Sequence, residues 1–227
     1  MNGLQYKFQF QDKHSEILRV VPIADENQRA EAPEWTRLEF HQCPNCPLRS
    51  DAHPHCPMAL QMVELVNMAS RLQSYDAVTI QVEDGERGIQ KTTTLQRGVG
   101  SVMGLLAAIS GCPRTAFLRP MAHFHLPFSS ETETVYRVAS MYLLAQYLRA
   151  QQGLAADWQL NELKQHYEQL HTVNVAMASR LRAISKLDGA INALVLLDLL
   201  AMAMPYSVDE ALQELKPIFA SYLTTER

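Results

Sequence analysis

Four cysteines are the residues of this chain best suited to chemistry, and a proline follows each of them. Cys43, Cys46 and Cys56 lie in "HQCPNCPLRSDAHPHCP", and Cys112 lies in the distant "SGCPRT". The C-x-x-C spacing of Cys43 and Cys46 lets two sulfurs face one ion from a single turn. Cys56 stands at an expected helix start, where the helix dipole and free N–H groups favour a thiolate. Four thiolates would complete a tetrahedral zinc site or an iron–sulfur cluster.

The prolines favour the cluster over zinc. Zinc knuckles commonly run C-P-x-C-G, whereas Pro47 follows Cys46 here. Proline has no N–H and a φ fixed near about −65°, which disfavours the usual knuckle turn. Cys-Pro is familiar from ferredoxin motifs. We therefore expect a [4Fe–4S] cluster held by four cysteines, on condition that folding brings Cys112 to the other three.

Two alternatives stay open for this site. The first is a compact zinc site made from the three clustered cysteines and either His53 or His55. The second is that no metal binds, the loop thiols being free and Cys112 a small buried residue. Three further side chains are candidate neighbours of a metal centre, where they would shuttle protons or offset thiolate charge: His123, His125 and Arg114.

Composition and charge limit the class of protein. The 227 residues are 47% apolar and 19% charged, which is typical of a globular chain. A net charge of −4 without a basic stripe predicts no nucleic-acid partner. The N-terminal "MNGLQYKFQFQDKH" lacks the apolar core of a secretory signal. The most apolar stretch, residues 190–204, is shorter than the about 20 residues of a bilayer span. We expect a cytoplasmic protein with reduced thiols and no membrane partner.

The elements that must position the cysteines are predicted from periodicity. Alternating patterns predict strands in "LQYKFQF", "SEILRVV", "EWTRLEF", "DAVTIQV" and "IQKTTTL". Helical spacing begins at Pro57, directly after Cys56, and returns from Arg97 onward. The predicted class is α+β, with a small N-terminal antiparallel sheet, one packed helix, and a mainly α-helical C-terminal half. We expect a sheet region with the Cys loop over 1–97 and a helical region over 98–227, joined through the Cys112 segment into one globular unit.

The helical half contains several boundary signals. Ser130 and Glu133 form a capping-box pattern that opens a helix to about residue 152. A long helix over 158–187 carries an apolar seam in which Asn174 is the polar position. This seam would close a hairpin with the 130–152 helix or form a homodimer. A second capping box at Ser207 predicts a new helix after residue 204, and Pro217 kinks or breaks the last helix.

The motifs "CPNCPL", "HCP" and "GCPRTAFLRPMAHFHLPF" also support a family assignment. Residues 39–128 resemble an uncharacterised bacterial family of unknown function. The resemblance implies a bacterial origin and groups Cys112 and the histidine segment with the first three cysteines. It implies no reaction.

The sequence thus predicts a cytoplasmic iron–sulfur protein acting in electron transfer or in redox or gas sensing, with a redox or regulatory protein as partner. The alternative is a structural zinc protein whose helical half is a protein-interaction module. A further alternative is a metalloenzyme with His123 or His125 near its substrate.

Overall fold

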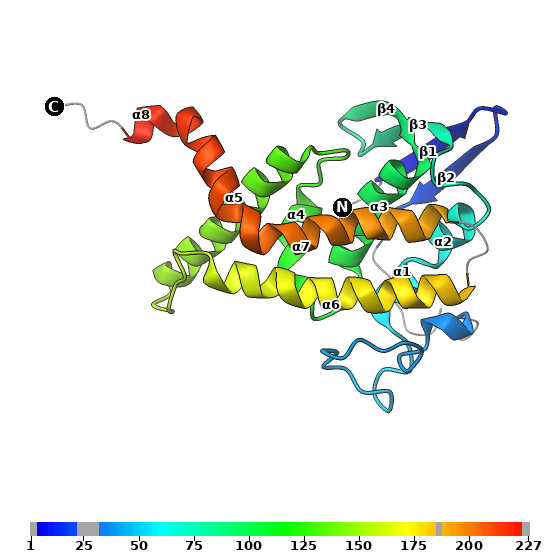
Figure 1. Ribbon diagram of the computed structural model, residues 1–227, viewed down its shortest axis with the longest axis horizontal. Coiled ribbons are helices and arrows are strands. Elements are labelled where there is room, and N and C mark those ends of the chain that lie inside the picture. Colours follow the sequence, from blue (N-terminus) through cyan, green and yellow to red (C-terminus); the bar gives the residue numbers. More distant parts are fainter. Residues whose placement is uncertain (1–3, 22–31, 185–187, 224–227) are drawn as a thin grey trace.

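An antiparallel sheet of four strands occupies the N-terminal part of the chain (Figure 1). The computed structural model describes residues 4–21, 32–184 and 188–223. The strands are β1 (Gln5–Phe10), β2 (Ser15–Arg19), β3 (Ala77–Glu83) and β4 (Gly88–Thr94), in the order β2-β1-β3-β4. Tyr6, Phe8 and Ile80 are fully buried on one sheet face, as their alternation predicts. The helix α3 (Leu95–Ile109) packs on this face, where Gly98 lies against Ile80.

The third predicted strand, over residues 34–40, is wrong. The segment forms the short 3-10 helix η2 (Glu34–Thr36), and Arg37 makes an isolated antiparallel bridge with His55. Trp35 and Leu38 are both buried. Trp35 lies within the 3-10 helix and Leu38 follows it after the extended Arg37, so tertiary burial overrides the local strand pattern.

Helices form the rest of the chain, so the predicted α+β class is confirmed. The helix expected after Cys56 is divided into two, and the capping box of Ser130 with Glu133 opens α5 as predicted. The break expected at Ser207 is wrong, because one helix continues to Leu215, before Pro217. The remaining bounds are α1 (Pro57–Gln61), α2 (Val63–Ala69), η3 (Ala116–Leu118), α4 (Arg119–His123), α5 (Glu131–Gln151), α6 (Asn161–Ile184), α7 (Gly189–Leu215), η4 (Lys216–Phe219) and α8 (Ala220–Leu223).

The two longest helices, α6 and α7, lie side by side across the molecule (Figure 1). The seam of α6 is buried within the chain as far as Leu181. Its first half shares an apolar cluster with α5, and the helix packs along α7 over most of its length. The apolar face of α6 therefore packs against other helices of the same chain. The last predicted residues of this helix, 185–187, lie outside the described residues.

One apolar cluster joins the sheet to the helices. It contains Tyr6 and Ile80 from the strands, Cys56 and Cys112, and Met177 from α6. The division of the chain at residue 97 stays a prediction. Among the helices of the described ranges, none has the length and apolar character needed to cross a membrane.

Candidate functional site

The fold brings the Cys112 segment to the loop that carries the other cysteines. Arg114, two residues after Cys112, donates from Nε to the carbonyl of Asn45 at 2.7 Å. Its Nη1 donates to Gln169 Oε1 at 2.8 Å, and the Asn45 amide donates to the Gln169 carbonyl at 3.0 Å. Arg114 therefore links this segment to the loop and to α6. The condition set by the sequence, that the Cys112 sulfur join the other three, is not met within the described residues.

The four thiols are protected by the core. Cys56 and Cys112 are buried, and Cys43 and Cys46 are half-buried against the same cluster. Burial raises the pKa of the Cys43 thiol to about 12, and the nearby charges of Cys56, Cys46 and Cys112 act in the same direction. Burial also raises the pKa of Cys112. These groups are protonated at neutral pH, which does not suit a nucleophile.

The thiols are not arranged as a metal site. In the part of the chain that the structure describes, no three His, Cys, Asp or Glu side chains converge closely enough to hold a metal ion. The metal-binding function predicted from the sequence is therefore wrong in its iron–sulfur, zinc and metalloenzyme forms. A shared loop and shared burial bring cysteines near one another without giving the tetrahedral geometry that zinc or a cluster requires. The role of the four cysteines as residues of some other site stays a prediction.

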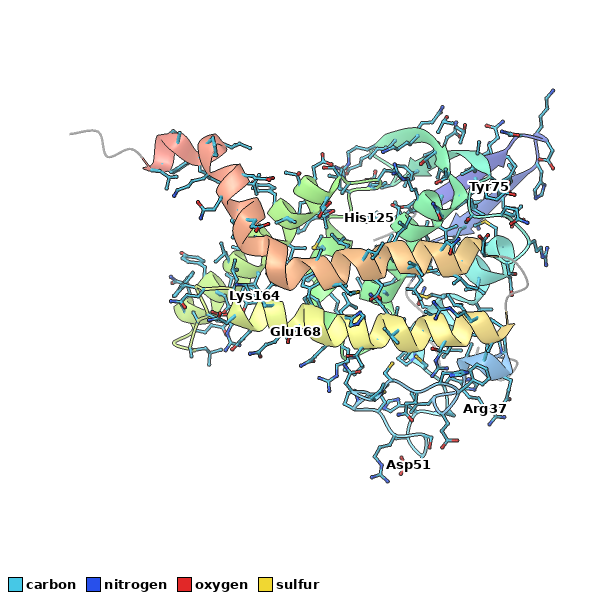
Figure 2. All side chains as sticks on the ribbon, viewed as in Figure 1. Arg37, Asp51, Tyr75, His125, Lys164 and Glu168 are labelled. Atoms are coloured by element: carbon cyan, nitrogen blue, oxygen red, sulfur yellow. The ribbon has the colours of Figure 1, made fainter. Side chains whose placement is uncertain are left out.

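The histidines proposed as alternative ligands occupy other positions. His53 is exposed, and His55 forms a hydrogen bond between Nδ1 and the Thr36 hydroxyl at 2.8 Å. His123 is exposed and stacks edge-on against Phe124. His125, by contrast, is half-buried and lies 2.5 Å from the Tyr6 hydroxyl; Figure 2 labels it.

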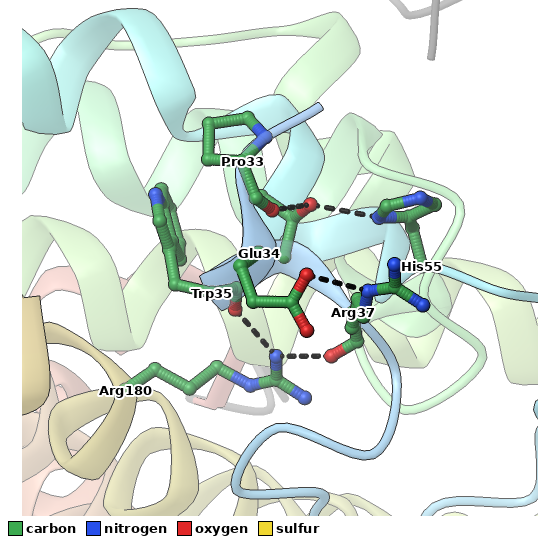
Figure 3. A network of polar contacts seen from close by, with 7 residues as sticks. Pro33, Glu34, Trp35, Arg37, His55 and Arg180 are labelled. Atoms are coloured by element: carbon green, nitrogen blue, oxygen red, sulfur yellow. Dashed lines mark hydrogen bonds and ion pairs between the residues drawn. The ribbon is translucent and has the colours of Figure 1, made fainter. Parts of the chain in front are cut away.

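A buried arginine that the sequence reasoning missed fixes the start of the cysteine loop. Arg180 of α6 is 1% exposed and donates to the carbonyls of Trp35 at 2.8 Å and Arg37 at 2.6 Å (Figure 3). It also donates to the carbonyl of Leu38 at 2.8 Å. Burial lowers the pKa of its guanidinium, and the nearby Cys56, Cys43 and Cys46 thiols oppose that shift. No carboxylate pairs with it among the described residues. The sequence held one indication of its burial, since Arg180 directly precedes Leu181 of the apolar seam.

A separate cavity of about 970 Å³ lies between the sheet, α3, α5, α6 and α7. Its volume is at the upper end of the range of small-molecule sites. The wall is mostly apolar, with leucines of α7 facing the small residues of α3. We call the part beside β4 and the start of α5 the sheet end, and the part beside Tyr167 and Asn174 the α6 end. Because the lining residues come from eight elements and the loop before α5, no single motif in the sequence marks the cavity.

At the sheet end, a short chain of hydrogen bonds joins β1, α3 and the loop before α5. Tyr6 Oη lies 2.5 Å from His125 Nε2 and 3.3 Å from Ser101 Oγ, and Ser101 Oγ accepts the N–H of Phe128 at 3.2 Å. Burial raises the pKa of Tyr6, so its hydroxyl stays protonated. The Ser101 hydroxyl then donates to Tyr6, and Tyr6 donates to His125, which leaves the imidazole proton on Nδ1.

Arg137 of α5 holds the loop that carries His125. Its Nη2 donates to the carbonyls of Phe124 at 2.7 Å and Met121 at 3.3 Å, and its Nη1 to Ser129 Oγ at 3.4 Å. Burial, helped by the positive charge of Arg137, lowers the pKa of His125 to about 4. The imidazole is therefore neutral at physiological pH.

At the α6 end, two polar side chains line the cavity without a partner. Tyr167 and Asn174 are each 4% exposed, and neither the hydroxyl nor the amide forms a hydrogen bond within the described part of the chain. They are seven residues apart on α6, two turns along the same face, with Leu170 between them. The polar atoms of both side chains keep some accessible surface, since neither residue is among the fully buried polar groups that lack a partner. The α6 end therefore offers unused hydrogen-bonding groups to whatever fills the cavity.

A family model matches residues 4–220, and its description is a domain of unknown function, DUF6901. The chain belongs to this family. Membership of an uncharacterised family is thus confirmed over far more of the chain than residues 39–128, whereas the cysteine motifs as marks of the family stay a prediction. No curated protein and no solved structure significantly matches the chain. The family gives no activity, so function must be argued from the geometry above.

Proposed function

We propose that this protein binds a small, largely apolar molecule in the cavity between the sheet and α6. The observation that supports this most is the pair of unpartnered polar side chains, Tyr167 and Asn174, on an otherwise apolar wall. Because these groups are open to the cavity and make no hydrogen bond within the described residues, a bound ligand can supply the missing partner. A cytoplasmic location, a protein partner and a homodimer stay predictions from the sequence.

A cavity-filling substitution tests the proposal. Gly104 of α3 lines the cavity, and a Cβ there would meet Leu197 at an ordinary 3.7 Å. We expect Nile red, a neutral apolar dye, to bind the native protein saturably with a rise in fluorescence. We expect Gly104→Leu to weaken this binding at least about tenfold, because the leucine side chain occupies the ligand volume.

The matched control is Gly88→Leu. Gly88 begins β4, and a Cβ there would meet no atom within 4 Å. This variant should bind Nile red as the native protein does, and circular dichroism should show that both variants are folded. The proposal fails if the native protein does not bind the dye saturably, or if Gly104→Leu binds it as tightly.

Removal of the Asn174 amide should stabilise the ligand-free protein. We expect Asn174→Leu to raise the free energy of unfolding in urea by about 1 kcal/mol, because a leucine there adds apolar contact to the cavity wall and removes an amide that has no partner within the described residues. The control is Asn192→Leu, since the Asn192 amide donates to Ser74 at 3.1 Å and to Asp188 at 2.8 Å. Asn192→Leu should lower the free energy of unfolding. Equal destabilisation by both changes would show that Asn174 has a structural partner and is not held for a ligand.

A further inference from the structure

We propose that the ligand is an elongated molecule carrying one carboxylate, and that this group binds at the sheet end of the cavity. This inference rests on the proposed function, because it assigns the chemistry of the molecule that the cavity would hold. It depends on the length of the cavity and on the distribution of charge along it.

The cavity follows one helix face for most of that helix. Its lining includes α3 residues from Gln96 to Ala108, a length of about 18 Å at about 1.5 Å per residue. Gly100, Gly104 and Ala108 repeat every four residues on this face, and α7 approaches it closely, since a Cβ on Gly100 would meet the Ala193 carbonyl at 3.6 Å. The leucines of α7 form the opposite wall. An extended apolar body fits this shape better than a compact one.

Cations gather at the sheet end and not at the α6 end. Lys91 of β4, Arg97 of α3 and Arg137 of α5 all line the sheet end. Lys91 lies 5.9 Å from the centre of the Phe128 ring, which fixes it beside the cavity. Arg97 has no hydrogen bond or ion pair within the described residues. Lys91 and Arg97 are both exposed, and Arg97 is a cation that a bound anion could neutralise.

The acidic groups at this end do not cancel the cations. Glu131 and Glu133 line the same region, which leaves a formal surplus of one positive charge. Glu133 is already engaged, since its carboxylate accepts the N–H of Ser130 at 2.7 Å in the capping box. The first turns of α3 and α5 also lie here, and helix N-termini add positive partial charge. His125 is neutral and adds none. A surplus of this size suits a monoanion such as a carboxylate, while an ammonium group would be repelled.

Probes that share one alkyl chain and differ in head group test the assignment. We would measure displacement of Nile red by dodecanoate, dodecanol and dodecyltrimethylammonium at low ionic strength, below the concentrations at which they form micelles. We expect dodecanoate to displace the dye at about tenfold lower concentration than dodecanol, the effect of one charge-assisted hydrogen bond. Dodecyltrimethylammonium should be the weakest of the three.

The variant Lys91→Gln/Arg97→Gln should remove the preference for dodecanoate and leave the affinities for dodecanol and Nile red unchanged. The control, Lys7→Gln/Arg71→Gln, makes the same change in net charge at exposed positions that do not line the cavity, and it should keep the preference.

If the native protein binds Nile red but treats dodecanoate and dodecanol alike, the carboxylate inference is overturned and the binding function stands. If Nile red does not bind, the proposed function itself fails. If both double variants lose the preference equally, the effect is one of net charge and the assigned position is wrong.

Discussion

Substitution of Arg180 by methionine is expected to lower the free energy of unfolding by about 3–5 kcal/mol. Methionine fills much of the same volume, yet it leaves the carbonyls of Trp35, Arg37 and Leu38 without the donors that now reach them. Each unsatisfied buried acceptor costs about 1–3 kcal/mol. Removing the buried charge of Arg180 stabilises the variant, but by less than the three lost hydrogen bonds destabilise it. Urea denaturation followed by circular dichroism measures the change.

The control for this prediction is Arg182→Met on the same helix. Arg182 is exposed, so its loss should change stability by no more than about 0.5 kcal/mol. Limited trypsin digestion gives a second readout, because the exposed Arg49 lies in the cysteine loop that Arg180 anchors. Faster cleavage there is expected in Arg180→Met alone. If the two methionine variants unfold at the same urea concentration, Arg180 does not hold the loop.

Acidification should destabilise the protein through His125. Its pKa is about 4 in the folded protein, against an ordinary value of 6.5. Because the folded pKa is the lower one, the unfolded chain binds the extra proton between these values. The contribution of the neutral imidazole is therefore complete above pH 6.5 and is lost as the pH falls toward 4. Its size is about 3 kcal/mol.

The variant His125→Gln isolates this effect from the other groups that titrate in acid. Glutamine can still accept the Tyr6 hydroxyl, but it does not bind a proton in this range. We expect the native protein to lose about 3 kcal/mol more than His125→Gln between pH 6.5 and pH 4, measured by urea denaturation at each pH. Parallel pH profiles for the two proteins would mean that His125 titrates normally and is not held neutral by burial.

Local patterns predicted much of the fold because local physics determines it. The alternation of Tyr6 with Phe8 and the capping box of Ser130 with Glu133 act within a few residues, and both appear as expected. The segment 34–40 departs from its pattern because Trp35 and Leu38 are buried by distant elements. The predicted helix start at Ser207 fails for a related reason. A cap motif specifies an N-terminus only where the preceding backbone leaves the helix, and here α7 continues through it.

The site was less predictable than the fold. Spacing does not specify the directions of sulfur atoms, and the four cysteines do not form the expected metal geometry in the described part of the chain, although Arg114 ties the Cys112 segment to the loop. The cavity depends on eight elements meeting, which a single sequence does not show. Asn174 is the exception. A polar residue within the apolar seam of α6 was visible in the sequence, and it marks the α6 end of the cavity.

The anchor made by Arg180 has a consequence for synthesis of the protein. The bond from Arg180 to the Trp35 carbonyl joins residues 145 positions apart. Contacts of such long sequence separation form late, and a chain emerging from the ribosome cannot make this one until α6 is translated. Until then Cys43, Cys46 and Cys56 belong to a loop without its anchor. The nascent chain is therefore most open to thiol oxidation during the interval between translation of the loop and translation of α6.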